Sequence, residues 1–510
     1  MPASTSLSLD RLRSEGQAFM EEITREYYLS TAGLKATAEL QPLYEKYAAI
    51  LSPDALAMTL EAFRAAPDGS EEHRQTRILL EWLADSQTGR ELAGLEEREL
   101  AWEASAMIPL PDGSRMQYER TAIEMANSQD RARRLEIEKA KSKVVGAELA
   151  PLRQERFQRE RDIIERLDLA DGYNATWELL SGIEIGHLRA QCEQFLRDTQ
   201  AMWNDTFPEF VKRVLDIDPD DAHRSDALAL FRAREFDAAF PMRDMERQVQ
   251  RQVRDMGIDP LAAGRIRVDT AEREGKRSRA FCAPVRIPEE VYLVLRPHGG
   301  QTDWSTYLHE LGHALHFAYM RPDYPYEYRW LGDNSVTESY AMLFDHHMDD
   351  AGWLKRYTEL GDSTVRAFQR NAGFEELHYL RRYCAKFVYE THLYGGDTPW
   401  QSLPDLYVDL LTSATNFRYS PSEAFVDVDP RYYSARYLRA WQLQALLRET
   451  LTERYDADWW RNPRAGPWLV QSLFSEGQRE LAHEQARRVA TGGVDLSFAP
   501  LVRSVERLLS

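Results

Sequence analysis

Cysteine is scarce in this sequence. Only three occur in 510 residues, and Cys192, Cys282 and Cys384 lie far apart. Cysteines that are so few and so widely spaced exclude a disulfide framework and a cysteine-built metal site. Such low cysteine content is typical of proteins in a reducing compartment. The chain also lacks a run of about 18 apolar residues, and its N-terminal stretch has no basic segment followed by an apolar one. We therefore expect a cytoplasmic protein with no membrane partner.

Positive charge is in deficit as well. The chain has 64 lysines and arginines against 83 aspartates and glutamates, a formal net charge of −19. Such a balance repels polyphosphate, so nucleic acid is not expected as a partner. The oligomeric state stays open, because nothing in the composition bears on it.

The first half of the chain shows a clear helical periodicity. Between residues 1 and 260, apolar residues recur at three- and four-residue steps with charged residues between them, the pattern of amphipathic helices on a common core. The highly charged stretch 129–167 is predicted to form two long helices with solvated faces, broken near Gly146 and Pro151. We interpret residues 1–260 as an N-terminal helical lobe.

The pattern changes after residue 260. Three short segments, 264–270, 279–288 and 291–297, are rich in β-branched and aromatic residues and bounded by glycine and proline, which predicts a small sheet. Helices resume at about Thr302. Residues 261–510 are therefore predicted to form a second lobe, in which the sheet directly precedes a histidine-bearing helix.

That helix carries "HELGH". His309 and His313 are four residues apart, so on a helix their imidazoles can converge on one metal ion, with Glu310 beside it. This arrangement is typical of zinc peptidases. A third ligand is needed, and Glu338 lies in an apolar run 338 − 313 = 25 residues further on, where a buried carboxylate requires a partner. Asp333 is the competing candidate, but it lies in a turn-like stretch.

His316 follows one helical turn after His313 and points along the same helix. We expect it to pack or to support a ligand rather than to act as a fourth ligand.

These motifs, with "GKRSRAFCAP" at 275–284 and "DPRYYSARYLRAW" at 429–441, resemble those of the thimet oligopeptidase and oligoendopeptidase F family of zinc metallopeptidases, and more distantly those of angiotensin-converting enzyme. The resemblance implies a mainly α fold with two helical lobes flanking a deep cleft, and the small sheet beside the HExxH helix. It implies one zinc ion per chain held by His309, His313 and Glu338, with Glu310 as general base. The implied activity is that of a gluzincin-type metalloendopeptidase that hydrolyses internal bonds of short unstructured peptides.

The tyrosine-rich segment resembles the family's closing segment. By this resemblance Tyr437 is the oxyanion donor and Tyr433 a second catalytic tyrosine. The segment departs from the family just upstream, where Asp427, Val428 and Asp429 stand and no histidine occurs. We expect this departure to affect transition-state stabilisation or substrate preference.

The strand before the motif predicts how substrate is held. An extended peptide can pair backbone to backbone with an exposed strand edge, which gives affinity with little dependence on side chains. The residues expected there are Arg279, Ala280, Phe281, Cys282 and Ala283. Cys282 itself is expected to be a small buried residue.

Two alternatives remain open. A zinc carboxypeptidase or dipeptidyl carboxypeptidase would need cations for a substrate carboxylate, and Arg431, Arg436 and Arg439 could serve, although exposed helix arginines are the simpler account. A non-catalytic peptide-binding scaffold would normally have lost a metal ligand or the base, and this chain has all four.

Overall fold

Helices make up most of the molecule, which we describe from a computed structural model covering residues 7–510. The first six residues, where the N-terminal stretch considered above begins, lie outside the described part. The predicted mainly α class is confirmed, since the strands are few and form only small sheets. Within residues 7–510, no helix combines the length and the apolar character needed to cross a membrane.

The chain packs into two compact units, each assembled from separate stretches. Unit 1 comprises residues 1–87, 235–369 and 439–501, and unit 2 comprises residues 88–234, 370–438 and 502–510. The predicted lobes, 1–260 and 261–510, stay a prediction, as does the cleft between them.

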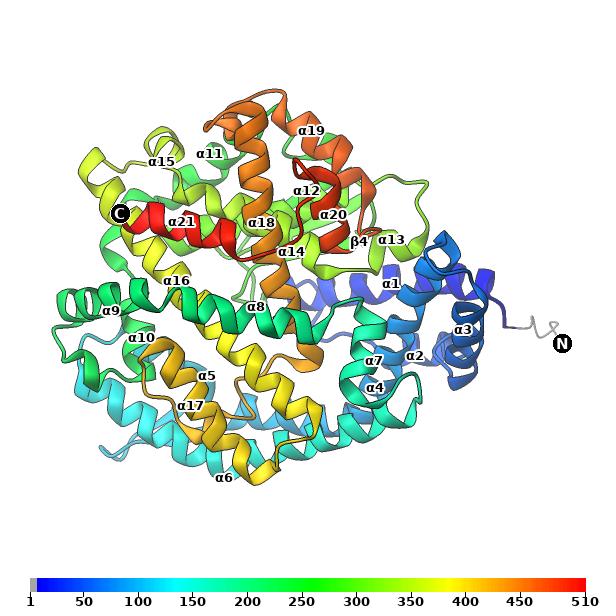
Figure 1. The fold of residues 1–510 in the computed structure, drawn as a ribbon, viewed down its shortest axis with the longest axis horizontal. Helices are drawn as coiled ribbons and strands as arrows, with labels where there is room; N and C mark the ends of the chain where they lie inside the picture. Colours follow the sequence, from blue (N-terminus) through cyan, green and yellow to red (C-terminus); the bar gives the residue numbers. More distant parts are fainter. Residues whose placement is uncertain (1–6) are drawn as a thin grey trace. The chain divides into compact units, whose positions relative to one another are not determined.

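The helices and strands follow one another along the chain as Figure 1 shows. The α-helices up to the three-stranded sheet are α1 (Leu9–Thr31), α2 (Gln41–Lys46), α3 (Pro53–Ala65), α4 (Glu71–Ser105), α5 (Tyr118–Asn127), α6 (Arg131–Arg166), α7 (Gly172–Ser181), α8 (Ile185–Asp198), α9 (Gln200–Leu215), α10 (Arg224–Leu230) and α11 (Met242–Asp255). Those after it are α12 (Gln301–Tyr319), α13 (Tyr326–Trp330), α14 (Asn334–Asp345), α15 (Ala351–Tyr357), α16 (Asp362–Gly395), α17 (Leu403–Thr415), α18 (Tyr433–Tyr455), α19 (Ala465–Ser472), α20 (Ala482–Val489) and α21 (Ala499–Leu509). The strands are β1 (Met107–Pro109), β2 (Arg115–Gln117), β3 (Ile266–Asp269), β4 (Phe281–Arg286) and β5 (Glu290–Val294).

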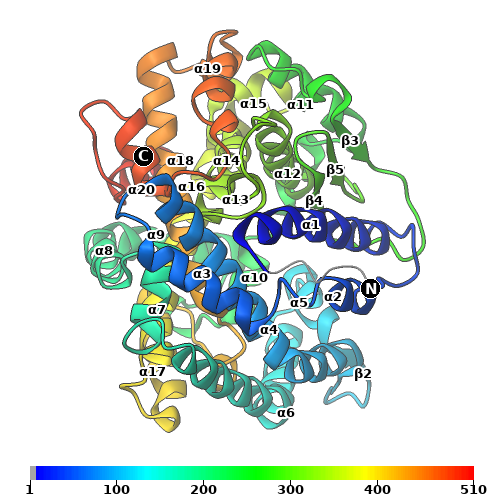
Figure 2. The same cartoon turned by 90° about the vertical axis from the view of Figure 1, so that its right-hand side faces the viewer.

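Unit 1 contains the predicted sheet directly before the histidine helix. Its strand order is β3-β5-β4, with β5 parallel to β3 and antiparallel to β4. β4 is therefore an edge strand of this sheet, and it packs against both α12 and α1. Figure 2 shows α1 running alongside β4. Tyr28 of α1 packs there on Ala283, Val285 and Val294, which fixes the sheet to the helices around it.

In unit 2, the charged stretch 129–167 forms one helix and not two. α6 runs from Arg131 to Arg166 without a break at Pro151, so the predicted break near Gly146 and Pro151 is wrong. A proline removes one backbone hydrogen bond from a helix, but the buried residues Leu149 and Ala150 continue the packed face across it. Gly146 packs closely, because a Cβ there would lie 3.2 Å from the Cβ of Ser422, which would have to shift slightly.

The charges of α6 are also not all solvated. Arg153 and Arg156 bind Glu99 of α4 at 2.7 and 2.8 Å, and both Arg156 and Glu99 are buried. Some of the interleaved charges of this stretch therefore join α6 to α4 instead of facing water. Sequence analysis also missed the short hairpin β1–β2, although the "PDGS" turn between the strands is a hairpin signal.

Candidate metal centre

α12 presents His309 and His313 on a partly exposed face. Trp304, Leu308, Leu311 and Leu315 lie on the opposite side and are completely or almost completely buried. His309, Glu310 and His313 are half-buried. The helix is thus held by its apolar face while the histidine face stays accessible.

α14 packs closely against α12 because of Gly312, the fourth residue of "HELGH". A Cβ at this position would lie 2.6 Å from the Cα of Ala341 and 2.7 Å from the carbonyl oxygen of Tyr340. Both are backbone atoms of α14, so they cannot move aside as a side chain can. Only glycine allows the two helices this separation.

The close approach brings Glu338 of α14 to the two histidines. Its Oε2 lies 3.6 Å from the Nε2 of His309 and 3.6 Å from the Nε2 of His313. The three ligand atoms all lie within 4.8 Å of one another. His309, His313 and Glu338 could therefore hold a metal ion.

The other nitrogen of each imidazole is already engaged. The Nδ1 of His309 donates to the Oδ2 of Asp345 at 2.9 Å, and the Nδ1 of His313 lies 2.9 Å from the Oγ1 of Thr337. A partner on Nδ1 fixes the ring orientation and leaves Nε2 for a metal. The two ligands from α12 are thus each oriented by a residue of α14.

The charges of this cluster favour ionised groups. Burial alone would lower the pKa of His309, but hydrogen bonds to Asp345 and Glu338 outweigh it and raise the pKa to about 10. Burial likewise opposes ionisation of Glu338, yet hydrogen bonds from His309 and His313 hold the pKa of its carboxyl well below the usual range. The protonated imidazole of His309 and the carboxylates of Asp345 and Glu338 stabilise each other. A divalent cation that displaces the proton of His309 therefore meets a negatively charged site.

Glu310 lies on α12, which packs against the edge strand β4. Burial and, to a smaller extent, the charge of Glu310 raise the pKa of the Cys282 thiol well above its ordinary value. Phe281, Cys282 and Ala283 belong to β4, whereas Arg279 and Ala280 precede it.

The competing candidates for the metal have other roles. Asp333 caps α14, since its Oδ1 accepts from the backbone N–H of Ser335 at 2.9 Å. His316 is completely buried, its ring 4.8 Å from that of Tyr340 and 6.0 Å from that of Phe474. Burial lowers the pKa of His316 to about 3, so its imidazole stays neutral and packs as an aromatic ring.

The two predicted tyrosines lie together at the start of α18, in unit 2. The rings of Tyr433 and Tyr437 are 4.9 Å apart, and Tyr437 also contacts Tyr383 at 5.8 Å. Their role at the metal stays a prediction. Of the arginines considered for carboxylate capture, Arg436 and Arg439 are buried, so the description of both as exposed helix arginines is wrong.

Sequence analysis missed how the segment before these tyrosines is held within unit 2. Asp427 forms an ion pair with Arg382 and accepts from Tyr407, and Asp429 binds Lys386 at 2.6 Å. Arg382 and Lys386 are buried on α16 and lie four residues apart, a spacing that places both on one helical face.

The backbone that follows these two aspartates is unusual. Arg431 and Tyr432 both have positive φ, 55° and 56°, a conformation that costs free energy in non-glycine residues. The N–H of Arg431 donates to the hydroxyl of Tyr394 at 3.0 Å, and the hydroxyl of Tyr432 donates to Asn174 at 2.6 Å. Asp427 and Asp429 therefore bind buried cations of α16, and the contacts of Arg431 and Tyr432 fix the path of the chain from these aspartates into α18.

No protein-family model matches the chain, and no curated protein sequence matches it. The resemblance carried by the motifs therefore stays a prediction, and the functional argument rests on the geometry of the residues.

Proposed function

We propose that the protein is a zinc-dependent oligopeptidase, cytoplasmic as the sequence predicts, that hydrolyses internal bonds of short unstructured peptides. The observation that carries the proposal is the convergence of His309, His313 and Glu338 with a carboxylate, Glu310, directly after the first histidine. Two imidazoles, one carboxylate and a neighbouring glutamate are the donor set of catalytic zinc sites in peptidases.

The residues present fit a zinc ion. Zinc prefers nitrogen and oxygen donors in a tetrahedral arrangement, and a catalytic site keeps one position open. Here three protein atoms are available, and the side chain of His309 remains 26% exposed to solvent. When bound, zinc would lower the pKa of a water molecule and polarise the substrate carbonyl.

Glu310 performs the proton transfers in this proposal. Its carboxylate takes a proton from the attacking water and delivers it to the leaving amine. The resemblance assigns the oxyanion hydrogen bond to Tyr437, with Tyr433 beside it. Asp345 holds the ring of His309 in place through Nδ1.

The edge strand supports the substrate class. β4 is an edge strand of its sheet and packs against α12, the helix that carries Glu310. A peptide that pairs with a strand edge must be extended, so a folded protein is a poor substrate. Broad sequence tolerance follows, because most of the hydrogen bonds go to backbone atoms.

The test combines metal content with product analysis. We expect purified protein to hold one zinc per chain and to cut a mixed peptide library at interior bonds, with C-terminally amidated peptides cut equally well. Glu310→Gln should retain the metal and lose at least about a hundredfold in kcat. The exposed Glu289, whose replacement Glu289→Gln leaves the site untouched, provides the control.

Two outcomes would change the assignment. If Glu310→Gln turned over peptides at the wild-type rate, another group would be the base. If cuts occurred only one or two residues from the C-terminus and amidation abolished them, the activity would be that of a carboxypeptidase, and the endopeptidase assignment would be wrong.

A further inference from the structure

Asp333 uses both of its carboxylate oxygens, and they bind different elements. Oδ1 accepts from the N–H of Ser335 and caps α14, whereas Oδ2 accepts from the N–H of Ala482 at 3.0 Å. Arg439 of α18 approaches the same Oδ2 to 3.7 Å. Asp333 as a whole is 1% exposed. A buried aspartate thus ties the start of the helix that carries Glu338 to the start of α20.

α20 holds α14 at a second point. The Nε2 of Gln485 donates to the hydroxyl of Tyr340 at 2.6 Å, and both residues are buried. The backbone of Tyr340 is in turn the surface against which Gly312 packs. One face of α14 therefore meets the histidine helix while another is attached to α20 at two places.

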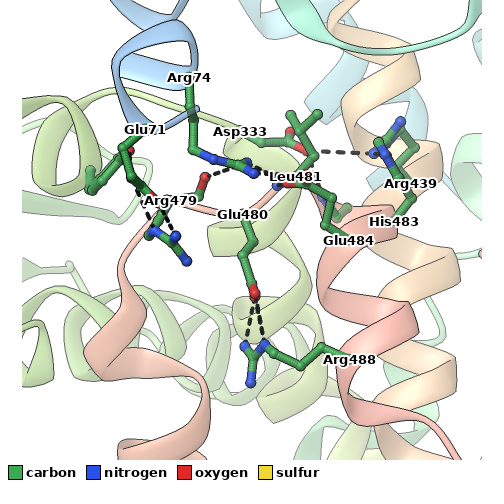
Figure 3. A network of polar contacts seen from close by, with 12 residues as sticks. Glu71, Arg74, Asp333, Arg439, Arg479, Glu480, Leu481, His483, Glu484 and Arg488 are labelled. Carbon is green, nitrogen blue, oxygen red and sulfur yellow. Dashed lines mark hydrogen bonds and ion pairs between the residues drawn. The ribbon is translucent and has the colours of Figure 1, made fainter. Parts of the chain in front are cut away.

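α20 is itself firmly anchored within unit 1, as Figure 3 shows. Glu484 receives two hydrogen bonds from Arg74 of α4, at 2.6 and 2.9 Å, and accepts from the N–H of Leu481 at 2.8 Å. Such bidentate arginine–carboxylate pairs fix geometry as well as adding binding energy. Arg479, just before α20, pairs with Glu71 of α4.

The metal ligands depend on where α14 begins. Glu338 lies 338 − 333 = 5 residues after Asp333, and Thr337, which contacts His313, lies four after it. Bond lengths to zinc tolerate deviations of only about 0.2 Å. A shift of the first turn of α14 would therefore displace Glu338 and release the ring of His313 together.

We propose that Asp333 is a positioning residue for the metal site, with Arg439 as its counter-ion. The pair fixes the N-terminus of α14 against α20 and thereby sets the distance from Glu338 to the two histidines. This inference rests on the metal-binding part of the proposed function and not on peptide hydrolysis. It assigns a role to a carboxylate that sequence analysis treated only as a competing ligand.

The test compares Asp333→Asn with a matched substitution in the same unit. Asparagine is nearly isosteric, but it loses the charge that faces Arg439 and one of the two acceptors. We expect zinc dissociation constants, measured by competition with a fluorescent chelator, to rise by about ten- to hundredfold. Asp350→Asn is the control, because Asp350 caps α15 through the N–H of Trp353 at 2.8 Å and has no hydrogen bond or ion pair with His309, His313 or Glu338; its zinc affinity should stay within about twofold.

The affinity is measured at a temperature where both metal-free variants are folded by circular dichroism. A merely structural role would lower the melting temperature of Asp333→Asn and leave zinc affinity unchanged, which would overturn the proposal. If Asp333→Asn fails to fold, Arg439→Gln decides instead. It removes the counter-ion of Asp333 and leaves the hydrogen bonds from Ser335 and Ala482 in place, and an affinity equal to that of the wild type would again overturn the proposal.

The same preparations separate this inference from the proposed function. A wild-type protein that binds zinc but cleaves no peptide would end the peptidase assignment and leave the positioning role to the affinity measurement. A wild-type protein that binds no zinc would overturn both.

Discussion

Gly312 is the single residue on which the approach of α14 to the histidine helix depends most directly. We predict that Gly312→Ala weakens zinc binding by at least about tenfold, because the new methyl group would meet backbone atoms 2.6 and 2.7 Å away. Overpacking of this kind also costs about 1–3 kcal/mol of stability. Chelator competition and urea denaturation measure the two effects.

Gly94 provides the matched control for this substitution. It is also a helical glycine, in α4, but a Cβ there would meet nothing within 4 Å. Gly94→Ala should leave zinc affinity unchanged and add about 0.5–1 kcal/mol of stability, since alanine is the better helix former. Equal zinc affinity in both variants would show that the separation of α12 and α14 does not set the site.

At the residue scale, the candidate ligands could be predicted because their signal is local. His309 and His313 are related by helical spacing alone, and Glu338 was found as a carboxylate inside an apolar run. Asp345 could not be predicted, although it also lies on α14. The contact between Asp345 and His309 depends on the angle at which α14 crosses α12. That angle is set by side-chain packing between the two helices, which cannot be deduced from a single sequence.

At the scale of elements, Glu290 joins the sheet to α1. The carboxylate, at the start of β5, accepts from Arg25 of α1 at 3.0 and 2.7 Å and from the hydroxyl of Tyr292 at 2.8 Å. The Arg25 hydrogen bonds are the largest influence, and against the effect of burial they lower the pKa of Glu290 to about 2. The ionised form is therefore the one that binds α1.

We predict a pH-dependent loss of stability in Glu290→Gln. A carboxyl with a depressed pKa stabilises the fold above its unfolded pKa of about 4.3, and this contribution is lost as the pH falls towards 2. At pH 7 the variant should lose about 1–2 kcal/mol, a value reduced for the solvent exposure of Arg25. Urea denaturation at pH 7, 5 and 3.5 measures the difference, which should shrink at the lowest pH.

The neighbouring Glu289 is the control for this measurement. It is exposed, so Glu289→Gln should change stability by less than about 0.5 kcal/mol at each pH. A stability loss in Glu290→Gln that was the same at pH 7 and pH 3.5 would contradict an electrostatic origin.

Secondary-structure elements could be predicted where the signal lies in a short stretch of sequence. The strands β3, β4 and β5 were expected because β-branched residues stand between glycine and proline. The continuity of α6 was not, since a proline in a charged helix indicates a break unless neighbouring residues such as Ala150 are known to be buried. The charge pattern of 129–167 predicted solvated faces, whereas Arg156 of α6 pairs with the buried Glu99 of α4.

At the scale of the whole molecule, the three candidate metal ligands lie in a unit made from three separate stretches of chain. The contact between Asp333 and Ala482 joins positions 149 residues apart, and no local pattern predicts such a pair. For this reason sequence analysis could name the ligands but not what holds them. Contacts of this range also mean that the site forms only when unit 1 is folded.

A metal ion that binds the folded chain and not the unfolded chain raises the free energy of unfolding. We predict that zinc raises the melting temperature with the logarithm of its free concentration, by an amount equivalent to about 4 kcal/mol at a thousand times the dissociation constant. Removal of the metal with a chelator should reverse the effect. His309→Ala should abolish it, because one of the three ligands is lost. Differential scanning calorimetry with and without zinc measures the shift.

A comparison of zinc with magnesium and calcium tests whether the imidazoles bind the metal. Magnesium and calcium prefer oxygen ligands, whereas two of the three donors here are imidazole nitrogens. Both hard cations should therefore leave the melting temperature unchanged at concentrations where zinc raises it. An equal shift with magnesium, or a shift with zinc that persisted in His309→Ala, would place the binding elsewhere on this strongly acidic chain. Only a rise that zinc causes and His309→Ala removes connects the stability of the molecule to these three residues.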